Sequence, residues 1–325
     1  MKVLVTGATS LIGRHTVEVL VRHGHEVTTF QRGEAPGVPT IRGAITDREA
    51  AGRACVGQDA VIHLAAKVGV AGAWRDYEHT NVHGTELMID VAERAGVRRF
   101  VHVSSPSVAH AGSALVGVGA APADPTATRG HYATSKALAE VAALRASSRA
   151  LPVVAIRPHL VWGPGDGQLV GRIVDRARRG RLALVGSGVA LIDTTYVSNA
   201  ADALVAALDR TPSIGGRVFV VSNGEPRTVH ELVARITDAA GVDWRPRHVP
   251  TRVATVAGGL AERLWDRLGR TDDPPMTSFL AEQLSTAHWF DQRETRAALG
   301  WEPAVSLADG FERLRRAFAA DGRPG

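Results

Sequence analysis

Cysteine and lysine are nearly absent from the 325-residue chain, which has one cysteine, Cys55, and three lysines among 38 basic residues. A single thiol excludes a disulfide framework and any zinc site built on several cysteines. No apolar run approaches the about 18 residues that a membrane span requires. A strand is predicted to begin at Lys2, which leaves no room for a leader peptide. We therefore expect a cytoplasmic protein with no metal centre and no membrane span.

The basic residues are almost all arginine, and the formal net charge is +5. They are scattered along the chain, and clusters such as residues 176–181 lack the interleaved aromatic side chains of a nucleic-acid stacking surface. Aromatic residues make up only 5% of the sequence. We therefore expect no nucleic-acid partner, and we interpret the charge as a solvated basic surface.

Apolar, β-branched segments alternate with segments of helical period through the first two-thirds of the chain. Strands are predicted at residues 3–5, 26–30, 40–42, 60–64, 100–104, 153–157 and 217–222, and helices begin near Ile12, Asp47, Tyr77 and Tyr132. This alternation predicts an α/β fold with a doubly wound parallel sheet of the Rossmann type. We expect a dinucleotide-binding domain over residues 1–160, with a return segment near residues 193–222. A smaller, mainly helical substrate lobe would occupy residues 161–325.

One segment of this lobe has an unusual apolar pattern. Residues 251–268 place five large apolar side chains at helical spacing, namely Val253, Val256, Leu260, Leu264 and Leu268. The favoured interpretation is a helix that faces the core or forms a lid. Peripheral membrane contact, or a groove for a partner, is the alternative.

A glycine-containing loop follows the first predicted strand directly. Gly7 permits the tight turn, and Gly13 lets helix and strand pack closely, so that a helix N-terminus faces a pyrophosphate. Ser10 stands where a middle glycine is usual, and its hydroxyl could bond a phosphate oxygen. The residues of this loop that we assign to cofactor binding are Gly7, Thr9, Ser10, Leu11, Ile12 and Gly13.

The second predicted strand ends in an arginine rather than the acid that would accept the ribose hydroxyls of NAD. Arg32 is placed to pair with a 2′-phosphate, and Arg14 could assist it. The alternative is that Arg32 merely faces solvent. We predict NADP(H) as the preferred cofactor, with NAD(H) as the second possibility.

Tyr132 and Lys136 stand four residues apart on one face of a predicted helix. With three tyrosines and three lysines in the chain, chance gives this spacing in roughly 3% of such sequences. A cation beside a phenol stabilises the phenolate and lowers the pKa of the phenol, which suits a general acid and base. Ser105 follows the fifth strand and could polarise a carbonyl, with Ser104 and Ser107 as alternatives.

Together these motifs resemble the extended short-chain dehydrogenase/reductases over nearly the whole chain. The matching segments are residues 6–13, 63–66 and 81–85, Ser105, Tyr132 with Lys136, and residues 157–164. Within that superfamily the chain is similar to the 3β-hydroxysteroid dehydrogenase-like branch, above all to the bacterial 2-alkyl-3-oxoalkanoate reductases of olefin biosynthesis. That likeness lies in residues 30–33, 106–108, 156–166, 222–226 and 282–289.

The resemblance implies a role for each catalytic candidate. Tyr132 would protonate the carbonyl oxygen as hydride arrives from the nicotinamide, Lys136 would hold the nicotinamide ribose, and Ser105 would orient the carbonyl. Homodimers are common among the look-alikes, so a homodimer is expected here.

The resemblance also implies cofactor contacts beyond the glycine loop. These would come from Ala65, Ala66, Pro158 and His159. One departure concerns the adenine, because relatives often carry an acid after the glycine that ends the third strand, whereas Ala44 follows Gly43 here. Adenine recognition is then either looser or supplied by Asp47.

Nucleotide-sugar epimerases and dehydratases share the core motifs but generally carry an arginine before an aspartate that pairs with the substrate diphosphate. Here Ile192 precedes Asp193, which speaks against a diphosphate substrate. We expect an NADP(H)-dependent oxidoreductase that interconverts the ketone and secondary alcohol of a small apolar substrate, preferably a 2-alkyl-3-oxoalkanoate. The alternatives are a 3β-hydroxysteroid dehydrogenase, a nucleotide-sugar epimerase or dehydratase, and a nucleotide-sensing protein without turnover.

Overall fold

A seven-stranded parallel sheet forms the centre of the protein. In the computed structural model, which describes residues 1–69, 71–109, 114–268, 277–320 and 322, its strand order is β12-β7-β5-β4-β1-β2-β3. The strands are β1 (Lys2–Thr6), β2 (Glu26–Gln31), β3 (Thr40–Arg42), β4 (Ala60–His63), β5 (Arg99–Val103), β7 (Val153–Pro158) and β12 (Val218–Val221). The predicted fold class is confirmed.

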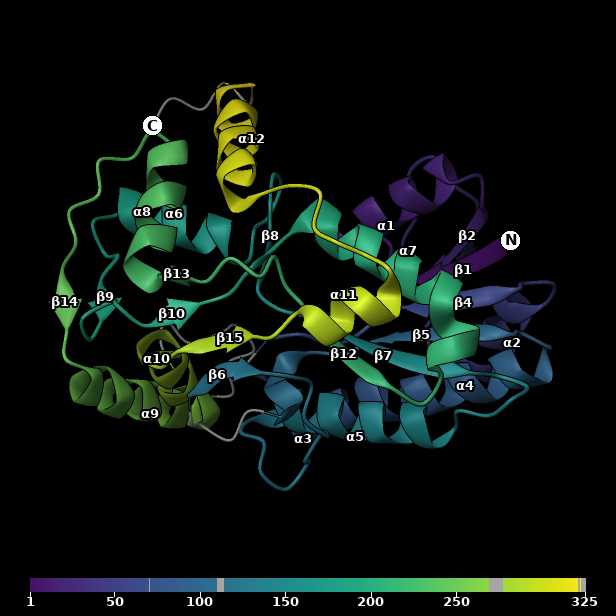
Figure 1. The fold of residues 1–325 in the computed structure, drawn as a ribbon. Helices are drawn as coiled ribbons and strands as arrows, with labels where there is room; N and C mark the ends of the chain where they lie inside the picture. The colour runs from purple at the N-terminus through teal and green to yellow at the C-terminus, as the bar shows by residue number, and fades with distance from the viewer. Residues whose placement is uncertain (70, 110–113, 269–276, 321, 323–325) are drawn as a thin grey trace.

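Helices cover both faces of this sheet (Figure 1). One face carries α1 (Leu11–Arg22), α7 (Val197–Ile214) and α11 (Arg293–Leu299), and the other carries α2 (Arg48–Cys55), α4 (Gly84–Arg94) and α5 (His131–Arg145). Side chains alternate along β1, so Val3 and Val5 pack with α1 and α7 while Leu4 packs on the opposite side with Phe30. Because both faces are covered, the inner strands are rich in apolar residues, whereas β2 and β3 at one side of the sheet contain more polar ones.

The order of the strands reverses between β1 and β4. β2 and β3 lie on one side of β1, whereas β4, β5, β7 and β12 extend on the other. At such a switch point a crevice opens at the carboxyl ends of the strands. The glycine loop after β1, Ala65 after β4 and Ser105 after β5 therefore share one edge of the sheet.

The lobe at this edge is mainly helical. Its helices are α6 (Val170–Arg178), α8 (Val229–Ala239), α9 (Thr251–Arg267), α10 (Ser278–Ser285) and α12 (Leu307–Ala320). Its core contains three aromatic rings among aliphatic side chains: the ring of Trp162 stacks on Phe311 at 4.6 Å and meets Tyr196 edge-on at 5.5 Å. None of the described helices is both long and apolar enough to span a bilayer.

Short strands complete the lobe. A four-stranded sheet has the order β13-β10-β15-β6. Its strands are β13 (Arg227–Thr228), β10 (Leu191–Ile192), β15 (His288–Phe290) and β6 (Leu115–Val118). Two further pairs join β8 (Val161–Trp162) to β11 (Thr195–Tyr196) and β9 (Leu184–Val185) to β14 (His248–Val249).

The two parts of the chain are interleaved more than the sequence suggested. β6 lies within the first 160 residues but pairs with β15 of the lobe. Leu299 and Trp301, near the C-terminus, belong to the core that α1 and α7 form against the sheet. The boundary placed at residue 160 stays a prediction.

The interpretation that the apolar residues of the segment 251–268 face the core is wrong, whereas its alternative form, a lid, stays a prediction. The side chains of its apolar residues are 51–64% exposed, namely Val253, Val256, Leu260, Leu264 and Leu268. Small residues face α10 instead: Ala254 is buried, and a Cβ on Gly258 would lie 2.5 Å from the carbonyl carbon of Thr277. α9 approaches its neighbour through small residues, so its large ones are left in solvent.

Candidate active site

The loop after β1 brings α1 close to the sheet. Gly7 has a φ of +72°, and a Cβ there would lie 2.8 Å from the backbone nitrogen of Ala65, so only glycine fits. A Cβ on Gly13 would lie 2.3 Å from the carbonyl oxygen of Gly7. Ser10 Oγ accepts a hydrogen bond from the Gly13 nitrogen at 3.0 Å and so caps α1. Its hydroxyl proton can still be donated to an anion at this helix N-terminus.

The end of β2 carries no carboxylate. Gln31 accepts a hydrogen bond from the Thr9 nitrogen at 3.3 Å and ties the glycine loop to this strand. Arg32 follows directly and is exposed. The nearby acid Glu34 is paired with Arg42 of β3. These residues fit a phosphorylated adenosine ribose, but the preference for NADP(H) stays a prediction.

Asp47, one of the two possibilities left for adenine recognition, is used locally. Its carboxylate accepts hydrogen bonds from the nitrogens of Glu49 and Ala50, each at 3.1 Å, and caps α2. A cap of this kind accepts hydrogen bonds from backbone N–H groups that have no partner within the helix. The side chain of Asp47 therefore has a structural function whether or not a nucleotide is near it.

Ser105, Tyr132 and Lys136 come together at the carboxyl edge of β5. The hydroxyl of Ser105 hydrogen-bonds the phenol of Tyr132, and both residues line a cavity of about 150 Å³. Lys136 is buried, and its Nζ donates to the carbonyl oxygen of Val103 at 2.7 Å. Ser107 lies 2.9 Å from Ser105, oxygen to oxygen, and lines the same cavity. Ser107, one of the two alternatives to Ser105, therefore lies at the same site as Ser105.

The influences on the pKa of Tyr132 differ from the expected lowering by the Lys136 cation. Burial is the main influence on Tyr132 and raises its pKa, while the hydrogen bond with Ser105 lowers it. Burial also lowers the pKa of Lys136 to about 8, against the opposing influence of the Glu140 carboxylate. The neighbouring His63 has a pKa lowered to about 3 by burial, so it is neutral. Tyr132 is therefore a protonated phenol at neutral pH, which suits a proton donor.

An irregular helix fixes the loop after β4 against α5. The predicted helix near Tyr77 is α3 (Trp74–Tyr77), a π-helical turn (Glu78–His83) and then α4. Asn81, in that turn, bonds the nitrogen and the carbonyl oxygen of Lys67 at 2.7 and 3.0 Å and donates to Ser135 Oγ at 2.9 Å. Ser135 directly precedes Lys136, so this contact positions the catalytic helix.

A buried ion pair joins α5 to β7. Glu140 accepts two hydrogen bonds from Arg157, at 2.8 and 2.5 Å, and the two side chains are 0% and 1% exposed. Arg157 also donates to the carbonyl oxygen of Ala121 at 2.7 Å. Bidentate geometry of this kind holds two elements in one register. It fixes the end of β7, where Pro158 and His159 enter the cavity wall.

Several cavity residues were not predicted from the sequence as site residues. They are Pro106, Leu115, Leu160, Gln283 and His288. The ring of His288 meets that of His159 edge-on at 5.1 Å, and its Nε2 donates to the carbonyl oxygen of Gln283 at 2.8 Å. Phe290 meets His159 at 5.0 Å. The segment around His288 resembled reductases, but no local pattern placed it beside Tyr132.

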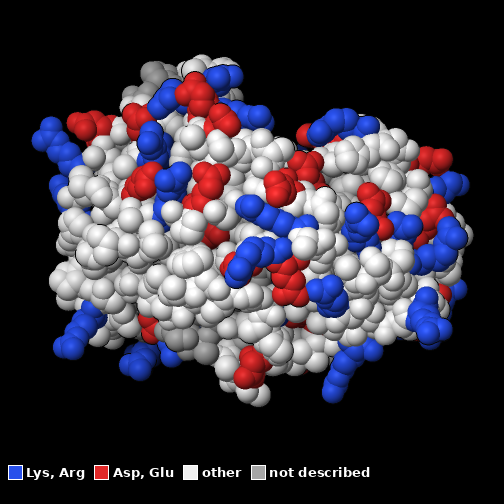
Figure 2. Space-filling model, in the orientation of Figure 1, with Lys and Arg blue, Asp and Glu red and all other residues white. Residues whose placement is uncertain are grey.

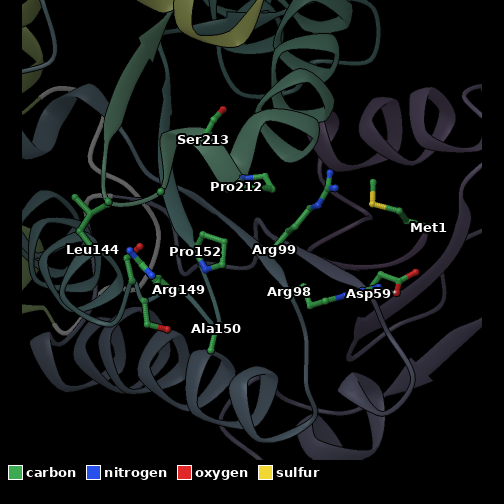
Figure 3. A pocket seen from close by; sticks show the side chains of 14 residues that line it. Met1, Asp59, Arg98, Arg99, Leu144, Arg149, Ala150, Pro152, Pro212 and Ser213 are labelled. Atoms are coloured by element: carbon green, nitrogen blue, oxygen red, sulfur yellow. Dashed lines mark hydrogen bonds and ion pairs between the residues drawn. The ribbon is translucent and has the colours of Figure 1, made fainter.

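A larger hollow, of about 850 Å³, lies at the opposite edge of the sheet (Figure 3). It is lined by residues that precede strands, such as Met1, Arg98 and Pro152. Arg98 is paired there with Asp59 at 2.8 Å. Doubly wound folds bind ligands at the carboxyl ends of their strands, so we place no chemistry at this amino edge.

A parallel sheet with a glycine loop at its switch point, and a Ser-Tyr-Lys group at the same edge, defines a nicotinamide-dependent oxidoreductase of the extended short-chain dehydrogenase/reductase class. The chain belongs to the NAD dependent epimerase/dehydratase family, whose match covers residues 3–222. The resemblance inferred from the sequence is thereby confirmed.

Individual relatives extend over the rest of the chain. The 2-alkyl-3-oxoalkanoate reductase of Stenotrophomonas maltophilia is 40% identical over 98% of this chain and 100% of its own. The human sterol-4-alpha-carboxylate 3-dehydrogenase, decarboxylating, is 29% identical over 97% of this chain and 87% of its own. Among solved structures, MoeE5 in complex with UDP-glucose and NAD has a TM-score of 0.76 at 25% identity, covering 99% of this chain and all of that one.

Proposed function

We propose that the protein is an NADP(H)-dependent oxidoreductase that interconverts a 2-alkyl-3-oxoalkanoate and its 3-hydroxy acid. The observation that carries this proposal is the cavity in which Ser105 and Tyr132 meet apolar side chains and two histidines. The 40% identity to a 2-alkyl-3-oxoalkanoate reductase over essentially the full length of both chains supports it.

In this proposal the nicotinamide, when bound, supplies hydride to the carbonyl carbon or accepts it from the carbinol. Tyr132 gives its phenolic proton to the carbonyl oxygen in reduction, and Ser105 orients that oxygen by a hydrogen bond. Lys136 would hold the nicotinamide ribose. The protonated state of Tyr132, favoured by its burial, matches the direction of reduction.

The remaining assigned residues would bind the cofactor. Gly7 and Gly13 let the loop turn tightly and α1 pack close to β1, so that the N-terminus of α1 faces a pyrophosphate, and Ser10 can donate to it. Arg32 would pair with the 2′-phosphate that distinguishes NADP(H) from NAD(H).

The acid group of the substrate requires positive charge or donors in the cavity, because a carboxylate loses its hydration there. Among the described residues that line the cavity, His159 and His288 are the imidazoles, a side-chain type whose ring nitrogens can donate hydrogen bonds to a carboxylate. The names of the bacterial reductase and the human dehydrogenase both specify a carboxylate on the carbon next to the one that is oxidised or reduced. We infer that the two histidines bind this carboxylate.

The apolar part of the substrate would lie against Leu115, Leu160 and Phe290. Ile192, which stands where epimerases generally carry an arginine, is 3% exposed and packs in the core of the lobe. A diphosphate would therefore find no partner at that position. This argument favours an apolar acid over the UDP-sugar that MoeE5 holds.

Oxidation of a long-chain 2-alkyl-3-hydroxy acid by the purified protein tests the proposal, with NADP⁺ and NAD⁺ compared. The oxidative direction avoids the spontaneous decarboxylation of β-keto acids. We expect NADP⁺-linked turnover of the hydroxy acid and none of UDP-glucose. Preferential oxidation of a 3β-hydroxysteroid with NAD⁺ would assign the protein to the steroid branch and refute both the substrate and the role of Arg32. Cofactor binding without turnover of the hydroxy acid, the steroid or UDP-glucose would indicate a nucleotide sensor instead of an enzyme.

A further inference from the structure

We propose that α9 docks on the surface of an anionic lipid bilayer through its exposed apolar stripe. The stripe consists of Val253, Val256, Leu260, Leu264 and Leu268, whose side chains are 56%, 64%, 60%, 51% and 61% exposed. At 1.5 Å per residue the helix is about 25 Å long, so the stripe is a continuous surface rather than a set of isolated side chains. The helix α9 lies at the outside of the lobe, below α10 in the view of Figure 1.

Positive charge follows one side of the stripe. Arg252, Arg263 and Arg267 are exposed, and each directly precedes a stripe residue, so at 100° per residue they lie on the same side. Among the described residues no acidic side chain pairs with these arginines. At the lower left of Figure 2, where α9 lies, the surface is largely uncharged and basic side chains project from it.

The described acid of α9 faces away from the stripe. Glu262 accepts hydrogen bonds from the nitrogen and Oγ of Ser278, both at 3.0 Å, on the side that packs against α10. The exposed side thus combines apolar residues with arginines alone among its described side chains. An amphipathic helix of this composition suits the boundary between acyl chains and anionic headgroups.

The packing of α9 favours a membrane over the other possible occupants. Its inner side is already filled, because Ala254 packs with Val185 and Ala281 in a small core. An antiparallel two-fold contact between two copies of α9 would bring the arginines of both copies to one side of the contact, and in a parallel contact too no described acid of the stripe would pair with them. Anionic headgroups, in contrast, offer the complementary charge.

The position of α9 links this surface to the cavity. α9 packs along α10, and Gln283 of α10 lines the cavity that holds Tyr132. A docked protein would therefore hold this side of the cavity towards the lipid. That an alkyl substrate could reach the cavity from the lipid rests on the proposed function, whereas the binding of α9 to lipid does not.

Flotation of the full-length protein with vesicles tests the proposal. We compare mixed phosphatidylglycerol and phosphatidylcholine vesicles with phosphatidylcholine alone. The wild type is expected to float with the anionic vesicles. Leu260→Ser with Leu264→Ser should lower the partition coefficient at least about tenfold, because apolar area is lost from the bilayer. Arg263→Gln with Arg267→Gln should remove most of the preference for anionic lipid.

The matched control is Val21→Ser with Val56→Ser, which changes two exposed apolar residues elsewhere, 51% and 71% exposed. This variant should float like the wild type, and circular dichroism should show all variants folded. No flotation, or flotation that survives the leucine substitutions, overturns the proposal. Self-association that the leucine substitutions abolish, without flotation, also overturns it and assigns the stripe to a second copy. Failure to turn over a hydroxy acid would contradict the proposed function and leave the vesicle result unchanged.

Discussion

The central sheet and α9 place the same kinds of residue in opposite environments. Val3, Leu4 and Val5 of β1 are all 0% exposed, whereas Val256 and Leu260 of α9 are 64% and 60% exposed. The strand has helices on both faces, while α9 has a neighbour on one side that it meets through small residues. An apolar pattern thus identifies a face of an element, and only the surrounding fold decides what covers that face.

The comparison extends to chemistry. At the sheet, function depends on a few side chains held in fixed places, so single substitutions should have large effects. At the lobe surface, function would be distributed over a stripe, and single substitutions should have small ones. The predictions that follow test this contrast, beginning with the largest effect.

Tyr132→Phe should lower turnover by at least about 10³-fold, because the proton donor is lost while the ring that fills the cavity remains. The variant should bind cofactor and unfold at the same temperature as the wild type. Steady-state rates, with cofactor binding followed by fluorescence, check this. Ser148→Ala on the distant surface hollow serves as the control. Retention of wild-type rates by Tyr132→Phe would remove the phenol from the mechanism.

The features set by local sequence were predictable. Tyr132 and Lys136 lie on α5 because their spacing is a property of one helix, and Gly7 and Gly13 follow from the contact of one strand with the next helix. The strands were found because most of them are runs of apolar or β-branched residues, such as β1, β4, β7 and β12.

The features set by distant contacts were not predictable. His288 reaches the cavity because β15 pairs with β6, a contact between segments far apart in the chain. The direction of the stripe on α9 depends on the packing of Gly258 against Thr277. The spacing of apolar residues in the sequence does not indicate this contact. The π-helical turn that positions Asn81 likewise depends on its tertiary contacts with Lys67 and Ser135.

The second prediction concerns Asp193, at the junction of sheet and lobe. Burial raises its pKa to about 6, against the hydrogen bonds from Ser222 and neighbouring backbone nitrogens. The folded protein thus holds this proton more tightly than the unfolded chain. The stabilisation is complete below the unfolded pKa and is lost as pH rises through about 6.

Its loss should lower the unfolding free energy by on the order of 3 kcal/mol between about pH 4 and pH 6. Asp193→Asn should lack that decline, which denaturant unfolding across this pH range measures. Asp209→Asn, on the surface, is the matched control and should keep the wild-type slope. The same slope in Asp193→Asn and wild type would contradict the assignment.

The third prediction concerns His288, which the lobe contributes to the sheet edge. His288→Gln should raise the KM for the hydroxy acid by about 10- to 100-fold, because a hydrogen bond to the charged carboxylate of the substrate is lost. The KM for the methyl ester of the same acid should change little. Equal effects on acid and ester would show that His288 only shapes the cavity.

The fourth prediction separates the two cofactors. Arg32→Ser should raise the KM for NADP⁺ by about 10- to 100-fold and leave that for NAD⁺ nearly unchanged. Arg53→Ser, on the neighbouring helix α2, removes another exposed arginine and should affect neither KM. An equal change for both cofactors would mean that Arg32 does not read the 2′-phosphate.

The last prediction returns to the opening contrast and includes the smallest expected effect, that of Leu260→Ala. Leu4→Ala should lower the unfolding free energy by about 2–5 kcal/mol, because it leaves a cavity between Phe30 and the helices of one face. Leu260→Ala removes the same atoms from α9 and should change it by less than about 0.5 kcal/mol, because those atoms are already in water. Denaturant unfolding of both variants in the absence of lipid measures the difference. A loss at Leu260 close to that at Leu4 would mean that the stripe is covered within the protein, and it would remove the basis for a docking surface.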